Sequence, residues 1–221
     1  MKKLIIFILI PILLGGFISL QTIGTEINPG HLTIKHCDMT LYLDVDTNTF
    51  ISRLDLKYSN FQKLDSDRDN KWFQDTYKGI YSKQFYLHSG YDLGHLTPSH
   101  ITSYNDTLNH SSFSLFNQAP QLAAFNRGKW AQLEGNVEDT IAKYKVNVTI
   151  ITGVIYNNKN KTYLGKSRIK MPISYYKILS ITTKKLLYVW VGSNINGEIV
   201  PINMKQLNEM LAINKNKLYF K

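Results

Sequence analysis

Apolar and polar residues alternate in the first extended segment of this chain, residues 39–45 (MTLYLDV). A period of two places alternate side chains on opposite faces, so this segment predicts a strand with one buried face. Similar reasoning extends along the chain, with a turn expected at Asp46. The predicted strands are residues 39–45, 50–58, 84–87, 146–156 and 185–191.

A helical period replaces the alternation from Pro120 onward. The apolar residues that recur near this period are Leu122, Phe125, Trp130, Leu133, Val137 and Ile141. They predict a helix with one buried face. Residues 65–75 (DSDRDNKWFQD) are polar and predict a surface loop, and residues 201–211 predict a closing helix. Antiparallel strands around a central helix make the expected fold class α+β.

The N-terminus has the layout of an export signal. Two lysines precede an apolar run at residues 4–14, and a pair of glycines follows it. This layout predicts a signal peptide at 1–24, a single domain at 25–221, and a secreted or periplasmic protein. The alternative is an uncleaved membrane anchor, because the apolar stretch can be extended to Leu20. The single cysteine, Cys37, cannot form an intramolecular disulfide and is interpreted as a buried small hydrophobe.

Charge narrows the candidate partners. The chain has 26 basic and 16 acidic residues, a formal net charge of +10, and it stays basic after loss of the two leader lysines. Such a surface attracts polyanions, of which nucleic-acid phosphates are the obvious example. A lysine-rich surface that serves only solubility is the alternative.

One constellation supplies the groups that phosphodiester hydrolysis needs. The reaction requires a base for water and a cation for the charge that builds on the phosphoryl and leaving oxygens. In residues 92–95 (DLGH), Gly94 is expected to let the backbone turn tightly and His95 to project from a strand end. Asn126 is expected to open a helix that continues through Glu134, which places these two side chains about 80° apart around one axis.

Several motifs in order resemble one known family, the DNA/RNA non-specific endonucleases related to the Serratia secreted nuclease and mitochondrial endonuclease G. The matching segments are residues 89–98 (SGYDLGHLTP), 117–121 (NQAPQ), 125–130 (FNRGKW) with 133–134 (LE), 151–153 (ITG) and 172–177 (PISYYK). The resemblance implies a ββα-metal (His-Me finger) nuclease fold with a central metal-binding helix. It also implies a metal-dependent, sequence-nonspecific endonuclease.

The resemblance assigns roles to individual residues. His95 corresponds to the general base, and Asn126 to the direct protein ligand of Mg²⁺, for which Mn²⁺ can substitute. Glu134 corresponds to the acid that hydrogen-bonds the metal's waters. The other matched site residues are Asn117, which orients groups in the site, Asp92 of the histidine motif, and Arg68 and Arg127, which are assigned to the substrate.

The chain departs from the family pattern at two positions. Leu93 occupies the place of the usual motif arginine, and Glu138 stands where some members carry another arginine. A catalytically weakened nucleic-acid-binding protein of the same fold therefore stays open as the alternative. Either function predicts DNA or RNA as a backbone-directed, salt-sensitive partner. No stable membrane partner is expected unless the leader is retained, and a homodimer is left open.

Overall fold

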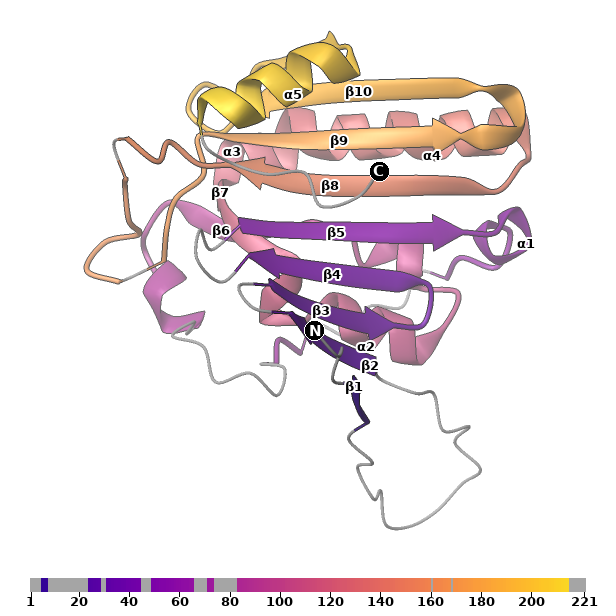
Figure 1. The fold of residues 1–221 in the computed structure, drawn as a ribbon, viewed down its shortest axis with the longest axis horizontal. Coiled ribbons are helices and arrows are strands. Elements are labelled where there is room, and N and C mark those ends of the chain that lie inside the picture. Colours follow the sequence, from indigo (N-terminus) through magenta and orange to yellow (C-terminus); the bar gives the residue numbers. More distant parts are fainter. Residues whose placement is uncertain are drawn as a thin grey trace.

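A long antiparallel sheet forms the centre of the molecule (Figure 1). The computed structural model describes residues 5–7, 24–28, 31–44, 49–65, 71–73, 83–159, 161–167 and 169–214. Within them, nine strands pair in the order β1-β2-β3-β4-β5-β8-β9-β10-β11. The strands are β1 (Ile5–Phe7), β2 (Gly24–Asn28), β3 (His31–His36), β4 (Met39–Asp44), β5 (Thr49–Leu56), β8 (Val148–Ile155), β9 (Ser174–Ile181), β10 (Leu186–Ser193) and β11 (Ile199–Ile202).

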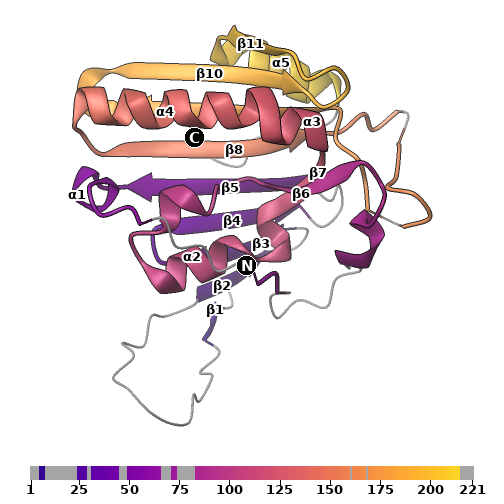
Figure 2. The same ribbon diagram turned by 180° about the vertical axis from the view of Figure 1, so that it is seen from behind.

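Helices cover the two faces of this sheet unequally (Figures 1 and 2). One face carries most of the helices and the two-stranded ribbon of β6 (Tyr91–His95) and β7 (Gln118–Leu122). The opposite face carries α5 (Met204–Ile213), over β9 and β10. The remaining helices are α1 (Tyr58–Phe61), α2 (Asp106–Ser112), α3 (Ala123–Phe125) and α4 (Ala131–Tyr144).

Alternation along β9 sorts the core into two layers. Tyr175, Leu179 and Ile181 belong to the larger cluster, which also holds the buried face of α4. Tyr176 and Ile178 lie in the smaller cluster, which includes Leu207 and Leu211 of α5. Because successive side chains of a strand point to opposite faces, β9 is apolar on both sides and its sequence does not alternate.

The predicted α+β class is confirmed, and four of the predicted strands appear close to their expected bounds. They are β4, β5, β8 and β10. The strand predicted at 84–87 is wrong, since Lys83–Tyr86 forms a 3₁₀ turn. A run of four residues is too short for periodicity to separate the two forms. Strand β9 has no predicted counterpart.

The start of the predicted central helix is also wrong. Pro120 lies inside β7, opposite Leu93, and the helix begins only at Ala123. In a two-stranded ribbon each strand has an open edge, where a residue without an N–H is tolerated. The interpretation of Cys37 as buried is wrong as well, because it is exposed in the β3–β4 turn with a φ of 51°.

Parts of other predictions fall outside the described residues. These are the turn at Asp46, most of the 65–75 loop, and residues 1–4 and 8–23 of the leader. Ile5–Phe7 is described as β1, paired antiparallel with β2. Among the described residues, no helix is long and apolar enough to cross a bilayer.

Candidate active site

His95 ends strand β6 and is held among aromatic rings. Its ring centroid is 4.6 Å from that of Trp72, with the planes tilted by 38°. The ring of Phe113 meets it edge-on at 5.0 Å and 89°. The side chain remains partly exposed. The neighbouring rings therefore hold the imidazole in place, and its Nε2 is buried although the residue as a whole is partly exposed.

Gly94 has a different function from the one predicted for it. It does not form a tight turn: it lies within β6 and pairs with Ala119 of β7. A Cβ on Gly94 would stand 2.2 Å from Oε1 and 2.5 Å from Cβ of Gln121. Glycine is needed here because the Gln121 side chain lies directly against its α-carbon.

Asn117 fastens the segment that follows the histidine. Its Oδ1 accepts from the Thr97 backbone N–H at 3.0 Å, and its Nδ2 donates to the Thr97 carbonyl at 2.8 Å. The same Nδ2 donates to the Ser112 carbonyl at 2.8 Å. Asn117 is fully buried, so its amide holds backbone two residues beyond His95. It therefore orients the site through the chain, with its own polar atoms already bound to protein.

Asn126 and Glu134 do not share one straight helix, which corrects the geometry predicted for them. Asn126 caps the short helix α3, and a wide turn over Asn126–Trp130 separates it from α4. Within that turn Gly128 has a φ of −108° and a ψ of −110°, far from helical values. The two side chains are thus carried by separate helices, and the angle expected around a single axis does not apply.

Asp92 fixes the orientation of the Asn126 carboxamide. Its Oδ2 accepts from Nδ2 of Asn126 at 2.9 Å. The amide nitrogen is thereby committed to the carboxylate, and Oδ1 is the remaining polar atom of that side chain. A carboxamide oxygen is a suitable ligand for a hard divalent cation, whereas the nitrogen is not. The residues present therefore fit the expected metal site, because Oδ1 of Asn126 is left to bind a cation.

Arg127 completes this cluster from the solvent side. Its Nε and Nη2 bind the two oxygens of Asp92 at 2.9 and 2.6 Å, and the arginine side chain is 73% exposed. Burial raises the pKa of Asp92. Hydrogen bonds from Arg127 and Asn126 lower it by a larger amount, so the pKa lies below its usual value of 3.8. Asp92 is therefore an anion at neutral pH and holds both neighbours.

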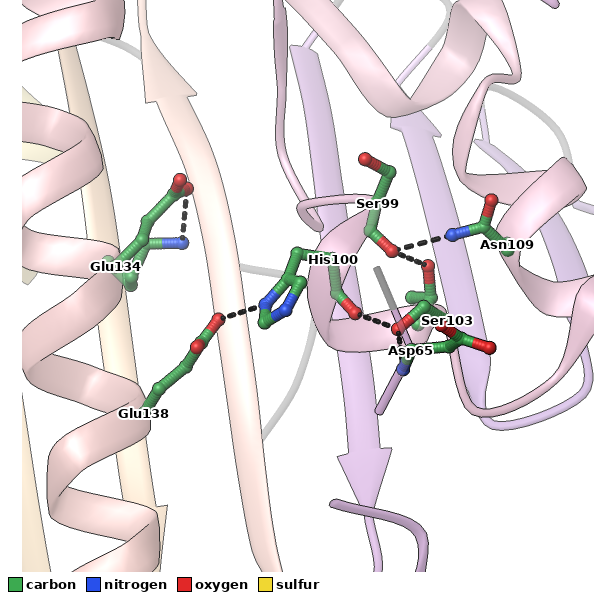
Figure 3. Close-up of polar contacts among 9 residues, drawn as sticks. Asp65, Ser99, His100, Ser103, Asn109, Glu134 and Glu138 are labelled. Carbon is green, nitrogen blue, oxygen red and sulfur yellow. Dashed lines mark hydrogen bonds and ion pairs between the residues drawn. The ribbon is translucent and has the colours of Figure 1, made fainter. Parts of the chain in front are cut away.

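Glu134 lies in the first turn of α4. Its Oε1 is 3.4 Å from Nζ of Lys177. Burial raises the pKa of the carboxyl group, although Lys177 acts in the opposite direction. One turn later, Glu138 binds Nδ1 of His100 at 3.1 Å, and Figure 3 shows both acids on the same side of α4. The His100 contact ties α4 to the turn five residues after His95.

The Leu93 departure has a structural counterpart. Leu93 packs against a small apolar cluster of Tyr86, Leu164 and Ile169, so the side chain at this position is used for packing. A guanidinium nevertheless reaches the motif aspartate, because Arg127 pairs with Asp92. Arg68, the other predicted substrate residue, lies outside the described residues.

Sequence reasoning missed Lys177 and Trp72 as members of this site. In the sequence, Lys177 is the last residue of a matched motif, and a lysine inside an apolar strand is itself a signal of a functional position. Trp72 belongs to a segment predicted only as a polar loop. In the described part of the chain, no three His, Cys, Asp or Glu side chains gather as a metal cluster. The single-ligand site expected on Asn126 does not require one.

Known proteins resemble this chain in sequence. It is 30% identical over 108 residues to a salivary endonuclease of Lutzomyia longipalpis, and 32% identical over 103 residues to the mitochondrial endonuclease G of Caenorhabditis elegans. A nuclease of Syncephalastrum racemosum is 31% identical over 119 residues. The matches cover 46%, 42% and 47% of this chain. The chain spans only 26%, 33% and 37% of these relatives, in the same order.

A solved structure has the same fold. A chain in the crystal structure of the EndoG/EndoGI complex superposes with a TM-score of 0.68 at 21% identity, covering 81% of this chain and 83% of that one. The ribbon β6–β7 followed by α3 and α4 is the ββα unit expected from the sequence. Residues 22–216 match the family described as DNA/RNA non-specific endonuclease. The chain therefore belongs to the DNA/RNA non-specific endonuclease family.

Proposed function

We propose that this protein is a Mg²⁺-dependent, sequence-nonspecific endonuclease that hydrolyses phosphodiester bonds of DNA, RNA or both. The observation that carries the proposal is the hydrogen bond from Asn126 to Asp92. It fixes a carboxamide oxygen beside the strand that ends in His95, within a family of endonucleases. Mn²⁺ would serve in place of Mg²⁺, since both accept oxygen ligands.

The proposed reaction uses a general base and a metal cation. His95 would take a proton from water, and the resulting hydroxide would attack phosphorus in line while the bond from phosphorus to the leaving oxygen breaks. The leaving oxygen would then take up a proton from water. Asn126 would hold the cation through Oδ1, and Glu134 would accept hydrogen bonds from the waters around it. When bound, Mg²⁺ neutralises the charge that develops on the phosphoryl group.

Positioning and substrate contacts would come from the remaining residues of the site. Asp92 orients Asn126, and Asn117 holds the backbone after His95. Arg127 is exposed beside Asp92, where its guanidinium would meet substrate phosphate. Arg68 keeps the phosphate-contacting function proposed from the family resemblance. Recognition of the sugar-phosphate backbone would allow cleavage without dependence on base sequence.

We also propose that the protein acts outside the cytoplasm, secreted or periplasmic, with retention by the N-terminal segment as the alternative. The proposal rests on the charged, apolar and small-residue order of residues 1–24. N-terminal sequencing of protein recovered from the medium or periplasm tests it. A mature protein that still begins at Met1 would contradict cleavage.

A catalytically weakened nucleic-acid-binding protein is the second candidate. The observation in its favour is Leu93, which fills the usual arginine position and packs into an apolar cluster. The two candidates differ in turnover and share nucleic-acid binding. Binding without cleavage at any Mg²⁺ concentration would favour the second.

A plasmid-nicking assay tests the proposed function. The parent should cleave with Mg²⁺ and stop with EDTA. His95→Ala should lose about 10²–10⁴-fold of the rate, because the base is removed. Asn126→Ala should lose metal-dependent cleavage. His88→Asn, a change at an exposed histidine in a turn, serves as the control and should cleave like the parent. A His95→Ala, Asn126→Ala double variant with parental activity would end the proposal.

A further inference from the structure

A buried lysine lies under helix α4. Lys177 is only 1% exposed and occupies a β9 position between Tyr175 and Leu179, whose side chains face the same layer as α4. Its Nζ donates to Oγ1 of Thr152 at 2.9 Å and lies 3.4 Å from Oε1 of Glu134. The ring of Trp130 lies 5.1 Å from the same nitrogen. The ammonium group is thus held on three sides.

Lys177 belongs to a row of polar side chains that crosses an otherwise apolar sheet face. Thr152 pairs with Lys177 across β8 and β9, and Ser52 pairs with Thr152 across β5 and β8. Cross-strand partners lie side by side on one face. Ser52 Oγ in turn lies 2.6 Å from Oγ1 of Thr97, two residues after His95. The row therefore runs from the histidine segment to the acid on α4.

We propose that Lys177 is a positioning residue that holds the Glu134 carboxylate for the waters of the metal site. This inference rests on the proposed function, in which Glu134 acts through those waters. The lysine is buried and lies 3.4 Å from Oε1, whereas the Glu134 side chain is 22% exposed, so the lysine would restrain the carboxylate from the buried side. One turn later on α4, position 138 is itself a glutamate bound to His100, and the cation beside Glu134 is the β9 residue Lys177.

Packing alone is a poor reason for a lysine at this position. Burying an ammonium and a carboxylate costs desolvation free energy, so a well-packed apolar pair of the same volume is often equally or more stabilising. The burial of Lys177 lowers its pKa, which reflects that cost. A leucine between Tyr175 and Leu179 would continue the apolar face of β9. The ion pair is therefore better explained by what it does to Glu134.

A double-mutant cycle tests the proposal with a readout other than cleavage. The variants are Lys177→Met, Lys177→Arg, Glu134→Gln and the combination of Lys177→Met with Glu134→Gln. Binding of Mn²⁺ alone is measured by loss of its free electron-spin-resonance signal, and folding by thermal melting. Lys170→Met is the matched control, because Lys170 is also buried, lies 5.2 Å from the Tyr156 ring and binds a neutral partner, Asn158.

Lys177→Met should weaken Mn²⁺ binding about 10–100-fold, the effect typical of losing a partner that orients a metal site. Adding it to Glu134→Gln should change the affinity no further. Lys177→Arg should keep most of the affinity, and Lys170→Met should match the parent. If Lys177→Met does not fold, Lys177→Gln, which keeps a donor for Thr152 without the charge, replaces it in the cycle.

Two results would overturn the inference alone. One is a folded Lys177→Met protein with parental Mn²⁺ affinity, when the unsubstituted protein cleaves nucleic acid and depends on His95 to do so. The other is an equal loss of affinity in the Lys177 variant with and without Glu134. A parent that binds no Mn²⁺ would overturn both the inference and the proposed metal site. A pure packing function predicts that melting temperature changes while the affinity of the folded protein does not.

Discussion

At the scale of single residues, the four positions of the DLGH motif (residues 92–95) have different structural functions, some in hydrogen bonding and some in packing. Asp92 binds Asn126 and Arg127, and Leu93 fills an apolar cluster. Gly94 makes room for Gln121, and His95 ends the strand among aromatic rings. Four consecutive residues thus serve four different purposes. Only the last is expected to meet the reacting groups.

Asp92→Asn should weaken metal binding without changing the size of the side chain. An asparagine accepts hydrogen bonds through only one oxygen, and its own NH₂ group would face Arg127, so the carboxamide of Asn126 is held less firmly. We expect Mn²⁺ affinity to fall about 10–100-fold, as measured by titration of the apo protein. Asp139→Asn, an exposed change on α4, is the control. Equal affinities in the two variants would contradict this view of Asp92.

Gly94→Ala should destabilise the protein through overpacking. The added methyl would stand 2.2 Å from Gln121 Oε1 and 2.5 Å from its Cβ, so the ribbon has to shift. We expect a loss of about 1–3 kcal/mol in unfolding free energy, measured by urea denaturation. Gly135→Ala is the matched control, because its Cβ meets nothing within 4 Å and it lies on the exposed side of α4. That change should stabilise by about 0.5–1 kcal/mol. Similar losses in both variants would refute the packing argument.

At the scale of elements, the site is assembled from separate pieces. Strand β6 supplies His95 and Asp92, the wide turn after α3 supplies Asn126, and α4 supplies Glu134. The break at Gly128 lets α4 change direction and lie on the sheet through Leu133, Val137 and Ile141, without carrying Asn126 along the same axis. The opposite sheet face carries α5, whose start is fixed by a capping box of Asn203 and Gln206.

Asn203→Ala should affect stability and leave the chemistry unchanged. The Asn203 side chain accepts from the Gln206 backbone N–H at 2.9 Å, and loss of such a cap costs about 0.5–2 kcal/mol. Because α5 packs on the face opposite α4, cleavage per folded molecule should equal that of the parent. Thermal melting checks the expected loss of stability, and plasmid nicking below the melting temperature checks that cleavage is unchanged. A large fall in cleavage by fully folded protein would show that the two faces are coupled.

At the scale of the whole molecule, a basic protein carries its proposed catalytic residues on one side of the sheet. The formal net charge is +10, and the proposed catalytic residues lie on the face with β6, β7 and α4. Such a charge raises the local concentration of a polyanion and speeds its encounter. The second face holds a separate apolar cluster under α5. Nucleic acid is therefore expected to approach from the α4 side.

Binding to duplex DNA should weaken steeply with salt and should not depend on base sequence. Each phosphate neutralised by a lysine or arginine contributes roughly −0.9 to the slope of log affinity against log salt concentration. The His95→Ala protein allows binding to be measured without cleavage, by fluorescence anisotropy between about 50 and 200 mM NaCl. Duplexes of equal length and unrelated sequence should give the same curve. A flat salt dependence would rule out backbone-directed recognition.

The outline of the fold could be predicted where residue patterns are local. The alternation at β4 and the helical period of Leu133, Val137 and Ile141 both led to elements that exist. Strand β9 has no predicted counterpart because Ser174, Lys177 and Ser180 interrupt its apolar run, and the break after α3 has none because Gly128 interrupts a period that otherwise continues. The export of the protein remains a prediction.

The sequence by itself determined the family and the chemical groups, because a histidine, a carboxamide and their flanking motifs are recognisable in a linear order. Only the tertiary structure decided which atoms those groups offer. Three contacts show this: Asn126 Nδ2 donates to Asp92, Asn117 binds the Thr97 backbone, and Lys177 lies beside Glu134. They join residues 20 to 43 positions apart. Contacts of that range follow from how strands pair and helices pack, and no local pattern encodes them.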